Sequence, residues 1–282
     1  MNTSLDKIHE VISKSDHVVV LSGLDIVLEA GLNGVRGEHI AYDIEQKYGY
    51  ANDEIITSMF YSRRVDLFYK YYKEMILNKE LKPTPVHEGI VKIQEANRLD
   101  AVITRTTYSL HKKAGCKNVI ELHGSVEENS CPNCGKIFGS EHIRNAASVP
   151  LCDECGIPLR PGFTLLGETV DNGKMTKASN AVEDADVLLV IGAGLNSALC
   201  RHLLKYYKGN KMIVLGHEEA MGDEKANYQA YGNLGEMLTE ITKDLTVSKV
   251  KRASESEKAD ADEEASAEAE KKDSTKTAAE KK

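Results

Sequence analysis

The sequence predicts an α/β fold: a Rossmann-like parallel sheet with helices on both faces, an inserted four-cysteine zinc-ribbon module and a disordered C-terminal tail. Three observations support this prediction. Short β-branched runs alternate with helical patterns, and two C-x-x-C pairs interrupt the alternation. The segment from Lys251 to Lys282 contains no Val, Ile, Leu, Met, Phe, Tyr or Trp.

Five short apolar runs, rich in β-branched residues, predict buried parallel strands. They are His17–Leu21, Asp100–Thr104, Asn118–Leu122, Asp186–Ile191 and Lys211–Leu215. Residues with helical spacing lie between or after them, over Asp66–Leu77, Val86–Asn97, Met175–Glu183, Ala198–Tyr207 and Leu234–Leu245. Such alternation favours an open parallel sheet, whose ligands bind beyond the carboxyl ends of the strands.

Four cysteines in two knuckles predict a structural zinc site. They are Cys131, Cys134, Cys152 and Cys155, and 17 residues separate the two pairs. This gap lies in the range of roughly 15–20 residues that is typical of four-cysteine zinc sites. Four thiolates complete the tetrahedral shell of the metal and leave no open position for chemistry. Two disulfides or four free thiols are the alternatives, and the module is expected over about 127–161.

The composition predicts two regions, a folded domain over 1–246 and a disordered charged tail over 247–282. The tail is rich in Ala, Glu, Lys, Ser and Asp and cannot bury enough apolar surface to offset the entropy of ordering. It serves either to keep the chain in solution or to bind a partner.

The overall charge and the cysteine usage narrow the class of protein. A net charge of −8 argues against nucleic-acid binding as the main function. The N-terminus has no signal-peptide pattern, and no apolar run approaches the ~20 residues that span a bilayer. Cys116 and Cys200 are expected to be reduced core residues. We therefore expect a cytoplasmic protein without a membrane partner.

Several segments resemble the sirtuin family, and together they extend from about Leu5 to Leu245. Leu21-Ser22-Gly23 resembles the start of the family's T-G-A-G-I-S loop, and the segment from Gly31 to Arg36 resembles G-I-P-D-F-R. The segment from Val102 to His111 resembles V-I-T-Q-N-x-D-x-L-H. Glu121-Leu122-His123-Gly124-Ser125 matches E-L-H-G-S, and Gly192-Ala193-Gly194-Leu195 resembles G-T-S-L.

The resemblance implies NAD-dependent protein deacylase or ADP-ribosyltransferase chemistry, with NAD or ADP-ribose as the bound nucleotide and an acyl-lysine protein as substrate. His123 would be the general base that activates a ribose hydroxyl, unless it is only a retained, hydrogen-bonded histidine. The candidate nucleotide-binding residues are Gly23, Arg36, Arg105, Gly192, Ala193, Gly194 and Glu218. The three-residue turn at Gly192 has the context of a dinucleotide loop, although a tight turn for helix packing would look the same.

The departures from the family pattern are concentrated at the nicotinamide end. Asp25 stands where a glycine would let the backbone approach a pyrophosphate, so it brings a negative charge instead. Arg105, Thr106 and Tyr108 replace the glutamine, asparagine and aspartate of Q-N-x-D. Arg105 could pair with Asp25 or bind an anionic ligand, unless it is only a surface arginine.

Two hypotheses therefore stand side by side. The first is a divergent sirtuin-like deacylase or ADP-ribosyltransferase on a zinc-stabilised scaffold. The second is a catalytically inactive module that binds a nucleotide, ADP-ribose or another protein.

Overall fold

The computed structural model describes residues 3–32, 38–78 and 80–249. The chain divides into two units, Met1–Ser248 and Lys249–Lys282, and the description below concerns the first. Arg36 and nearly all of the predicted tail lie outside the described residues. Ser248 donates a hydrogen bond to Asp16 at 2.6 Å and therefore still belongs to the first unit, two residues beyond the predicted boundary.

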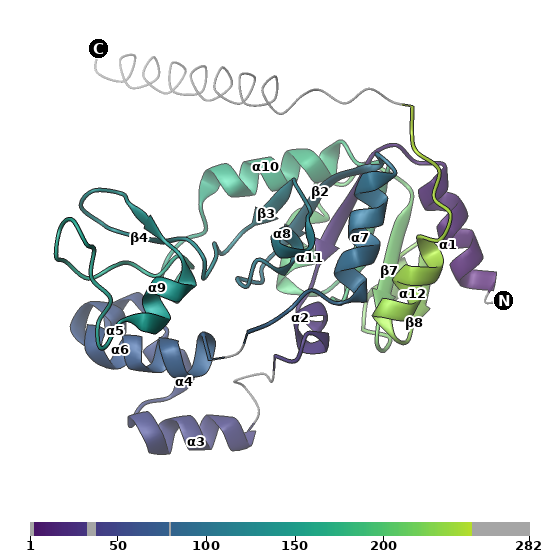
Figure 1. Cartoon of the computed structure of the whole chain (residues 1–282). Helices are drawn as coiled ribbons and strands as arrows, with labels where there is room; N and C mark the ends of the chain where they lie inside the picture. The colour runs from purple at the N-terminus through teal and green to yellow at the C-terminus, as the bar shows by residue number, and fades with distance from the viewer. Residues whose placement is uncertain (1–2, 33–37, 79, 250–282) are drawn as a thin grey trace, which may run out of the picture. The chain divides into compact units, whose positions relative to one another are not determined.

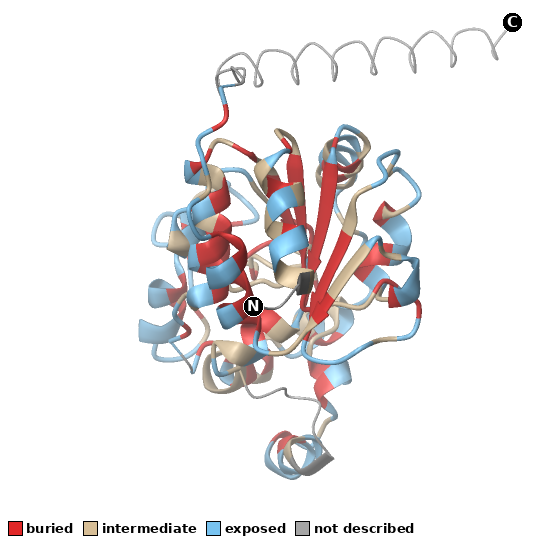
Figure 2. Cartoon of the chain, turned by 90° about the vertical axis from the view of Figure 1, so that its right-hand side faces the viewer, coloured by how far each residue is buried: buried red, intermediate tan, exposed pale blue. Residues whose placement is uncertain are grey.

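The centre of the first unit is a parallel sheet of six strands in the order β3-β2-β1-β6-β7-β8 (Figures 1 and 2). The strands are β1 (Val18–Ser22), β2 (Leu99–Thr104), β3 (Val119–Glu121), β6 (Val187–Ile191), β7 (Met212–Gly216) and β8 (Tyr228–Tyr231). The connections reverse direction between β1 and β6, which is the switch point where open α/β sheets bind ligands.

All five predicted strands are confirmed, with every end within one residue of its expected place. The prediction missed β8, whose sequence Tyr-Gln-Ala-Tyr has no β-branched residue. This strand lies at the edge of the sheet and is half-buried, so it does not need the continuous apolar run that marks β1 and β6.

Helices cover both faces of the sheet, as predicted. Val18 and Val20 of β1 point toward one face, where α1 (Thr3–Ser13), α7 (Pro85–Glu95) and α12 (Leu234–Ile241) pack. Val19 and Leu21 point toward the other face, where α10 (Asn172–Glu183) and α11 (Ala198–Leu203) pack. The side chains of β1 alternate between the faces because a strand has a period of two. Both helical layers are therefore anchored by the same short strand.

The predicted helix bounds need correction: α10 begins at Asn172 rather than Met175, and α7 ends at Glu95 rather than Asn97. Three further helices differ as follows. The helix over Asp66–Leu77 is α6 (Val65–Tyr71), which continues as the π-helix η1 (Tyr72–Ile76). The helix α11 ends at Leu203 rather than Tyr207, whose hydroxyl donates to the Asp186 carbonyl at the foot of the sheet. The helix α12 ends at Ile241, since Asp244 adopts a left-handed backbone conformation with φ +57°.

A second module lies at one end of the sheet and is built from two separate chain segments (Figure 1). The first segment, between β1 and β2, contains α3 (Glu38–Tyr48), α4 (Asn52–Ile55), α5 (Ser58–Arg63) and α6. The second contains the cysteines, the hairpin β4 (Asn129–Ser130) and β5 (Ile137–Phe138), and α9 (Ser140–Asn145). Their apolar side chains form one core, so the inserted module is larger than the predicted 127–161.

Aromatic residues join the two segments of this module. Phe68, Tyr69 and Tyr72 are fully buried and pack with Cys131, Cys152 and Leu159 from the cysteine segment. The hydroxyls of Tyr61, at 2.9 Å, and Tyr69 both donate to the Leu159 carbonyl. The helices α3–α6 and the metal segment therefore stabilise each other.

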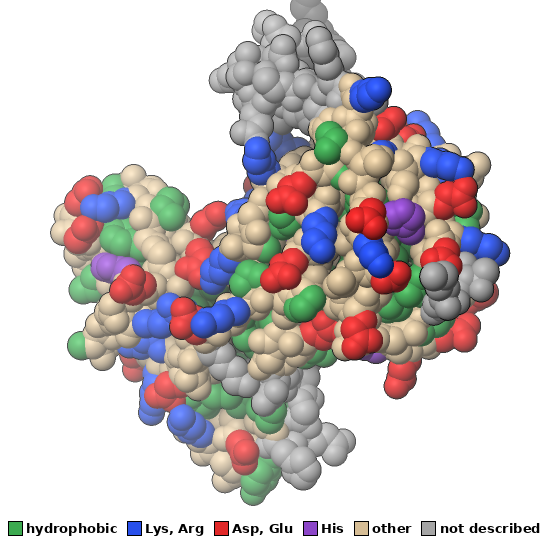
Figure 3. Space-filling view, turned by 45° about the vertical axis from the view of Figure 1, so that its right-hand side comes forward, with side chains coloured by type: hydrophobic (Ala, Val, Ile, Leu, Met, Phe, Trp, Pro, Cys, Tyr) green, Lys and Arg blue, Asp and Glu red, His purple; other side chains and the backbone are tan. Residues whose placement is uncertain are grey.

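The surface carries both signs of charge. Figure 3 shows acidic and basic side chains interspersed over much of the face that it presents. Among the described residues, no helix has an apolar stretch long enough to cross a bilayer.

Candidate functional site

A cavity of about 590 Å³ opens beyond the carboxyl ends of β1, β2, β3 and β6, at the switch point of the sheet. It is lined by the loops that follow these strands, by α2 (Asp25–Glu29) and by the start of α11. The lining includes Ser22, Gly23, Asp25, Arg105, Thr106, Tyr108, His123, Gly192, Ala193, Gly194 and Ser197. The structure therefore brings six of the candidate residues, four of them in the glycine-rich turns, around one space.

The loops after β1 and β6 touch each other at two glycines. A Cβ atom on Gly23 would lie 2.0 Å from the carbonyl oxygen of Gly192, so no larger residue fits there. Gly192 has φ +64°, and a Cβ on it would lie 3.1 Å from that of Asp25. Close packing alone therefore explains why both positions are glycine. The close contact also keeps the floor of the cavity free of side chains.

The turn after β6 is held by a buried carboxylate that the sequence analysis did not select. Asp223 is 1% exposed, and its Oδ1 accepts the Leu195 N–H at 2.9 Å while its Oδ2 accepts the Ala220 N–H at 3.0 Å. The predicted acid, Glu218, is exposed and does not line the cavity. Several acids follow β7, and no spacing rule distinguishes Asp223 from its neighbours.

His123 reaches the cavity from the end of β3. Its carbonyl oxygen accepts the Thr164 N–H at 2.8 Å. Gly124 turns the chain away with φ +74°, and a Cβ there would lie 2.2 Å from the Gly162 oxygen. Backbone hydrogen bonds thus hold Leu122 to β2 and His123 to the segment after the cysteines. They fix the position of the imidazole.

Arg105 binds the imidazole of His123 directly. Its Nε donates a hydrogen bond to His123 Nε2 at 2.8 Å. Burial lowers the pKa of His123, and the guanidinium charge of Arg105 lowers it further. The ring is therefore neutral at neutral pH, with Nε2 as the acceptor and the proton on Nδ1. Asp25, one of the two expected partners of Arg105, is not the group that binds its Nε; that nitrogen donates to the histidine.

Two further departures from the family pattern change the character of the cavity wall. Tyr108 lines the cavity and packs beside Val27 and Leu110, and burial raises its pKa to about 12, so the phenol stays neutral. Asp25 is half-buried; burial raises the pKa of its carboxyl, while the nearby His217 lowers it. The cavity wall thus holds the neutral phenol of Tyr108 where the family pattern has a carboxylate. It holds the carboxyl group of Asp25 where the family pattern has a glycine.

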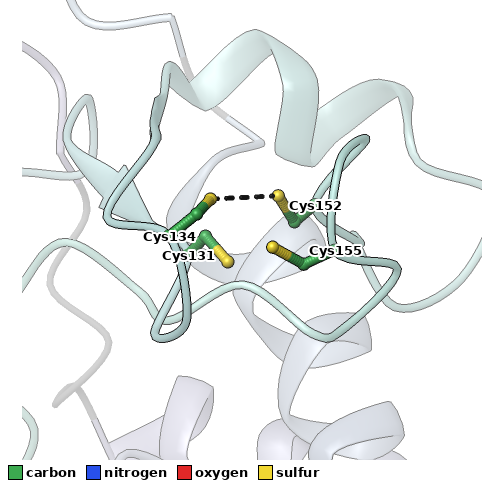
Figure 4. A group of neighbouring side chains, drawn as sticks. All are labelled: Cys131, Cys134, Cys152 and Cys155. Carbon is green, nitrogen blue, oxygen red and sulfur yellow. Dashed lines mark hydrogen bonds between the residues drawn. The ribbon is translucent and has the colours of Figure 1, made fainter.

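The four cysteines of the knuckles point toward one centre (Figure 4). Their sulfur atoms all lie within 4.8 Å of one another, and the Sγ atoms of Cys134 and Cys152 are 3.7 Å apart. A tetrahedral site with metal–sulfur distances of about 2.3 Å has sulfur–sulfur edges of roughly 3.8 Å. The donor set therefore fits zinc, and the separation is far longer than a disulfide bond.

The two knuckles have the same internal geometry. In each, the glycine after the second cysteine has a positive φ and donates its N–H to the first cysteine's carbonyl: Gly135 to Cys131 and Gly156 to Cys152, both at 2.9 Å. Lys136 joins the knuckles through exposed ion pairs with Asp153 at 2.9 Å and Glu154 at 2.8 Å. The backbone of both knuckles thus turns around the centre of the four sulfur atoms.

The family model described as "Sir2 family" matches residues 23–198, from the first cavity glycine to the start of α11. The chain belongs to the Sir2 family. An NAD-dependent protein deacetylase of Clostridium acetobutylicum is 31% identical over 241 residues, covering 84% of this chain and 98% of the relative. A protein of the same description from Clostridium tetani is 32% identical over 237 residues, with 84% and 96% covered.

Solved structures of Sir2 proteins share the fold. One, from a study of the mechanism and regulation of Sir2 enzymes, has a TM-score of 0.74 and 27% identity, covering 87% of this chain and 98% of that one. A Sir2 homologue in complex with NAD has a TM-score of 0.73 and 27% identity, covering 85% and 93%. This chain therefore has the fold of solved Sir2 proteins.

This Sir2-family chain also has cavity residues that the sequence analysis did not name. Leu24, Leu28 and Leu32 form an apolar side of the opening, with Leu24 57% exposed. They follow Gly23 at helical spacing, so the short helix α2 could have been found from that pattern. Ser22 also lines the cavity; the sequence analysis named it within the loop after the first strand but not among the candidate binding residues.

Proposed function

We propose that this protein is an NAD-dependent protein-lysine deacylase that binds NAD in the cavity at the end of β1, β2 and β6. The observation that carries the proposal is the position of His123, whose neutral imidazole lines the same cavity as the glycine contact of Gly23 and Gly192. The descriptions of the clostridial relatives as NAD-dependent protein deacetylases support it.

In this proposal the chain supplies binding, orientation and one base. The small residues after β1 and β6 leave room for the pyrophosphate, and Arg105 adds a positive charge beside it. NAD supplies a ribose carbon from which nicotinamide departs as the acyl oxygen of a modified lysine bonds to it. His123 Nε2 accepts the proton of a ribose hydroxyl, for which Arg105 must first release that nitrogen.

The metal site has a structural role in this proposal. Zinc would be held by Cys131, Cys134, Cys152 and Cys155, which fill all four positions. It would keep the segment that follows His123 folded. No reaction step uses it.

A second candidate function is nucleotide or ADP-ribose binding without turnover. The hydrogen bond from Arg105 to His123 favours it, because that bond occupies the lone pair that a base needs. Tyr108 favours it as well, because a neutral phenol cannot accept a hydrogen bond as a carboxylate does. The same cavity would then hold the ligand but not activate it. ADP-ribosyl transfer and protein interaction remain further alternatives of the same scaffold.

The deciding experiment measures nicotinamide release from NAD in the presence of an acetyl-lysine peptide, together with calorimetry of NAD and ADP-ribose. Nicotinamide release together with loss of the acetyl group from the peptide, abolished in His123→Ala and kept in His202→Ala, an exposed histidine of α11, would establish the deacylase. Binding without release would establish the second candidate. Absence of both binding and release would refute both and leave only a protein-interaction module.

We further propose that the protein acts in the cytoplasm and that the residues after Ser248 form a charged tail, two residues shorter than the expected 247–282. Supporting the first point, all six cysteines are free, as a reducing compartment would keep them. Supporting the second, the contacts of the chain divide it after Ser248.

A further inference from the structure

Two histidines lie side by side behind the cavity and are not used by the proposed reaction. His87 on α7 is 0% exposed and His111 on α8 (Leu110–Ala114) is 2% exposed. Their ring centres are 4.8 Å apart, and α7 and α8 are neighbours in the fold (Figure 1). Burial lowers the pKa of His87 to about 4 and that of His111 to about 3. Both rings are therefore neutral near pH 7, and each has one N–H donor and one acceptor nitrogen.

The N-terminus of α7 fixes which nitrogen of His87 carries the proton. The backbone N–H of Thr84 donates to His87 Nδ1 at 3.1 Å, as part of a capping box. An amide N–H can only donate, so Nδ1 is the acceptor and the hydrogen of the neutral ring is on Nε2. Within the described part of the chain, His87 Nε2 and His111 Nδ1 are both buried without a hydrogen-bond partner. Buried polar atoms of this kind normally find a partner, either in the protein or in a bound water.

The second ring nitrogen of His111 contacts a residue that lines the cavity. Its Nε2 lies 2.7 Å from the hydroxyl oxygen of Ser22, the last residue of β1 and part of the cavity lining. The hydroxyl can play either of two parts in this bond. If it donates to His111, it offers only lone pairs to a bound molecule. If it accepts from His111, its own hydrogen is free for the occupant of the cavity.

We propose that His87 and His111 form a relay that sets Ser22 as a hydrogen-bond donor to a phosphate oxygen in the cavity. His87 Nε2–H donates to His111 Nδ1 through one bridging water. His111 then carries its proton on Nε2 and donates to Ser22, whose O–H points to the anion. The Thr84 amide fixes the proton of His87, and the donor at each later bond is part of the proposal. Both histidines are positioning residues, and the assignment of a phosphate to the cavity rests on the proposed function.

The relay determines whether the contact between the Ser22 hydroxyl and a phosphate is attractive or repulsive. A hydroxyl that presents its lone pairs to a phosphate repels it, whereas one that presents its hydrogen makes a charge-assisted bond. The contact also explains why two neutral imidazoles with unpartnered nitrogens are kept in the interior beside α7.

The first test reads the tautomers directly in the full-length protein without any ligand. Long-range ¹⁵N–¹H NMR spectra between pH 6 and pH 8 are expected to show both His87 and His111 as neutral Nε2–H tautomers. Single variants of each histidine assign the signals. An Nδ1–H tautomer at His111, or a protonated ring at either position in this range, would overturn the relay.

The second test measures ADP-ribose affinity by calorimetry in a double-mutant cycle. Ser22→Ala and His111→Phe are each expected to weaken binding about tenfold, as for a lost bond to a charged group, and the double variant no further. His111→Gln, whose amide N–H can donate to Ser22, is expected to keep most of the affinity. Exposed His202→Ala is the matched control. Additive losses, or equal losses with Gln and Phe, would contradict the relay.

The two tests also separate the failure of the relay from that of the proposed function. Wild-type protein that does not bind ADP-ribose would refute nucleotide binding, while the tautomers would still decide the relay. Ser22→Ala removes a single oxygen, so its melting temperature should stay near that of the wild type even if the larger change at His111 destabilises the fold.

Discussion

Arg105 Nε donates a hydrogen bond to His123 Nε2 across 2.8 Å, and thereby ties the candidate base to the residue that replaces the family's glutamine. The bond has two effects. It keeps His123 neutral, which a base requires, and it occupies the lone pair that the base would use. The proposed catalysis therefore depends on whether a bound nucleotide draws the guanidinium away, and this dependence leads to the first prediction.

Arg105→Gln is expected to raise the pKa of His123, because it removes the neighbouring positive charge that holds this pKa down. A raised pKa reduces the fraction of neutral imidazole at a given pH, so the acid limb of any pH–rate profile should move to higher pH. An NMR titration of the His123 ring measures the shift without any activity. Arg201→Gln, on the exposed side of α11, is the control, and an unchanged or lower pKa in Arg105→Gln would be inconsistent with the bond.

Asp25→Asn is expected to tighten NAD binding by removing a negative charge from the cavity wall. Two like charges about 4 Å apart cost about 1 kcal/mol in water and more where solvent is excluded, so the gain should be about fivefold or larger. Calorimetry at two salt concentrations measures it, and the gain should shrink at high salt. Asp25→Gly should act in the same direction, although glycine in α2 has a separate backbone cost. Affinity that is unchanged in both variants would place Asp25 away from the phosphates.

Removal of the metal is expected to unfold more than the cysteine segment. Zinc binding contributes folding free energy, and the sulfur ligands share one apolar core with α3–α6. A chelator, or Cys131→Ser, should therefore lower the melting temperature and increase hydrogen exchange around Phe68 and Tyr72 as well as at residues 127–161. Cys116→Ala, outside the cluster, should keep one zinc per chain. Unchanged melting and exchange after chelation would show that the module does not depend on a metal.

Gly124→Ala is expected to destabilise the protein by about 2–3 kcal/mol or to prevent folding. The added Cβ would lie 2.2 Å from the Gly162 oxygen, in a residue whose φ is +74°. Gly139→Ala is the matched control, because a Cβ there meets nothing within 4 Å and the backbone φ is −69°. Urea denaturation gives both values, and equal stability of the two variants would contradict the tight turn after His123.

The sequence predicted the parts of the fold that have a strong periodic signal. The buried strands β1 and β6 are continuous apolar runs and were located within one residue, whereas β8, an edge strand with a glutamine, has no such run. The two-segment module was only half predicted, since the core that contains both Phe68 and Cys131 joins residues distant in the chain. No local pattern records such a contact.

The same distinction holds for the cavity. Gly23, Gly192 and His123 stand in recognisable motifs, and the fold brings them to one space. Asp223 and His111 act through burial and through partners from other elements, which a single acid or histidine in a sequence does not reveal. The partner of Arg105 was likewise decided by the positions of the ends of β2 and β3, not by local sequence.

A crystal structure of the protein with NAD and an acetyl-lysine peptide tests the central claim most directly. We expect the pyrophosphate beside Gly23 and Gly192, a ribose hydroxyl within hydrogen-bond reach of His123 Nε2, and Arg105 turned away from that nitrogen. A nucleotide bound elsewhere, or one in the cavity with Arg105 still on His123 and the nicotinamide end excluded by Tyr108, would contradict the deacylase.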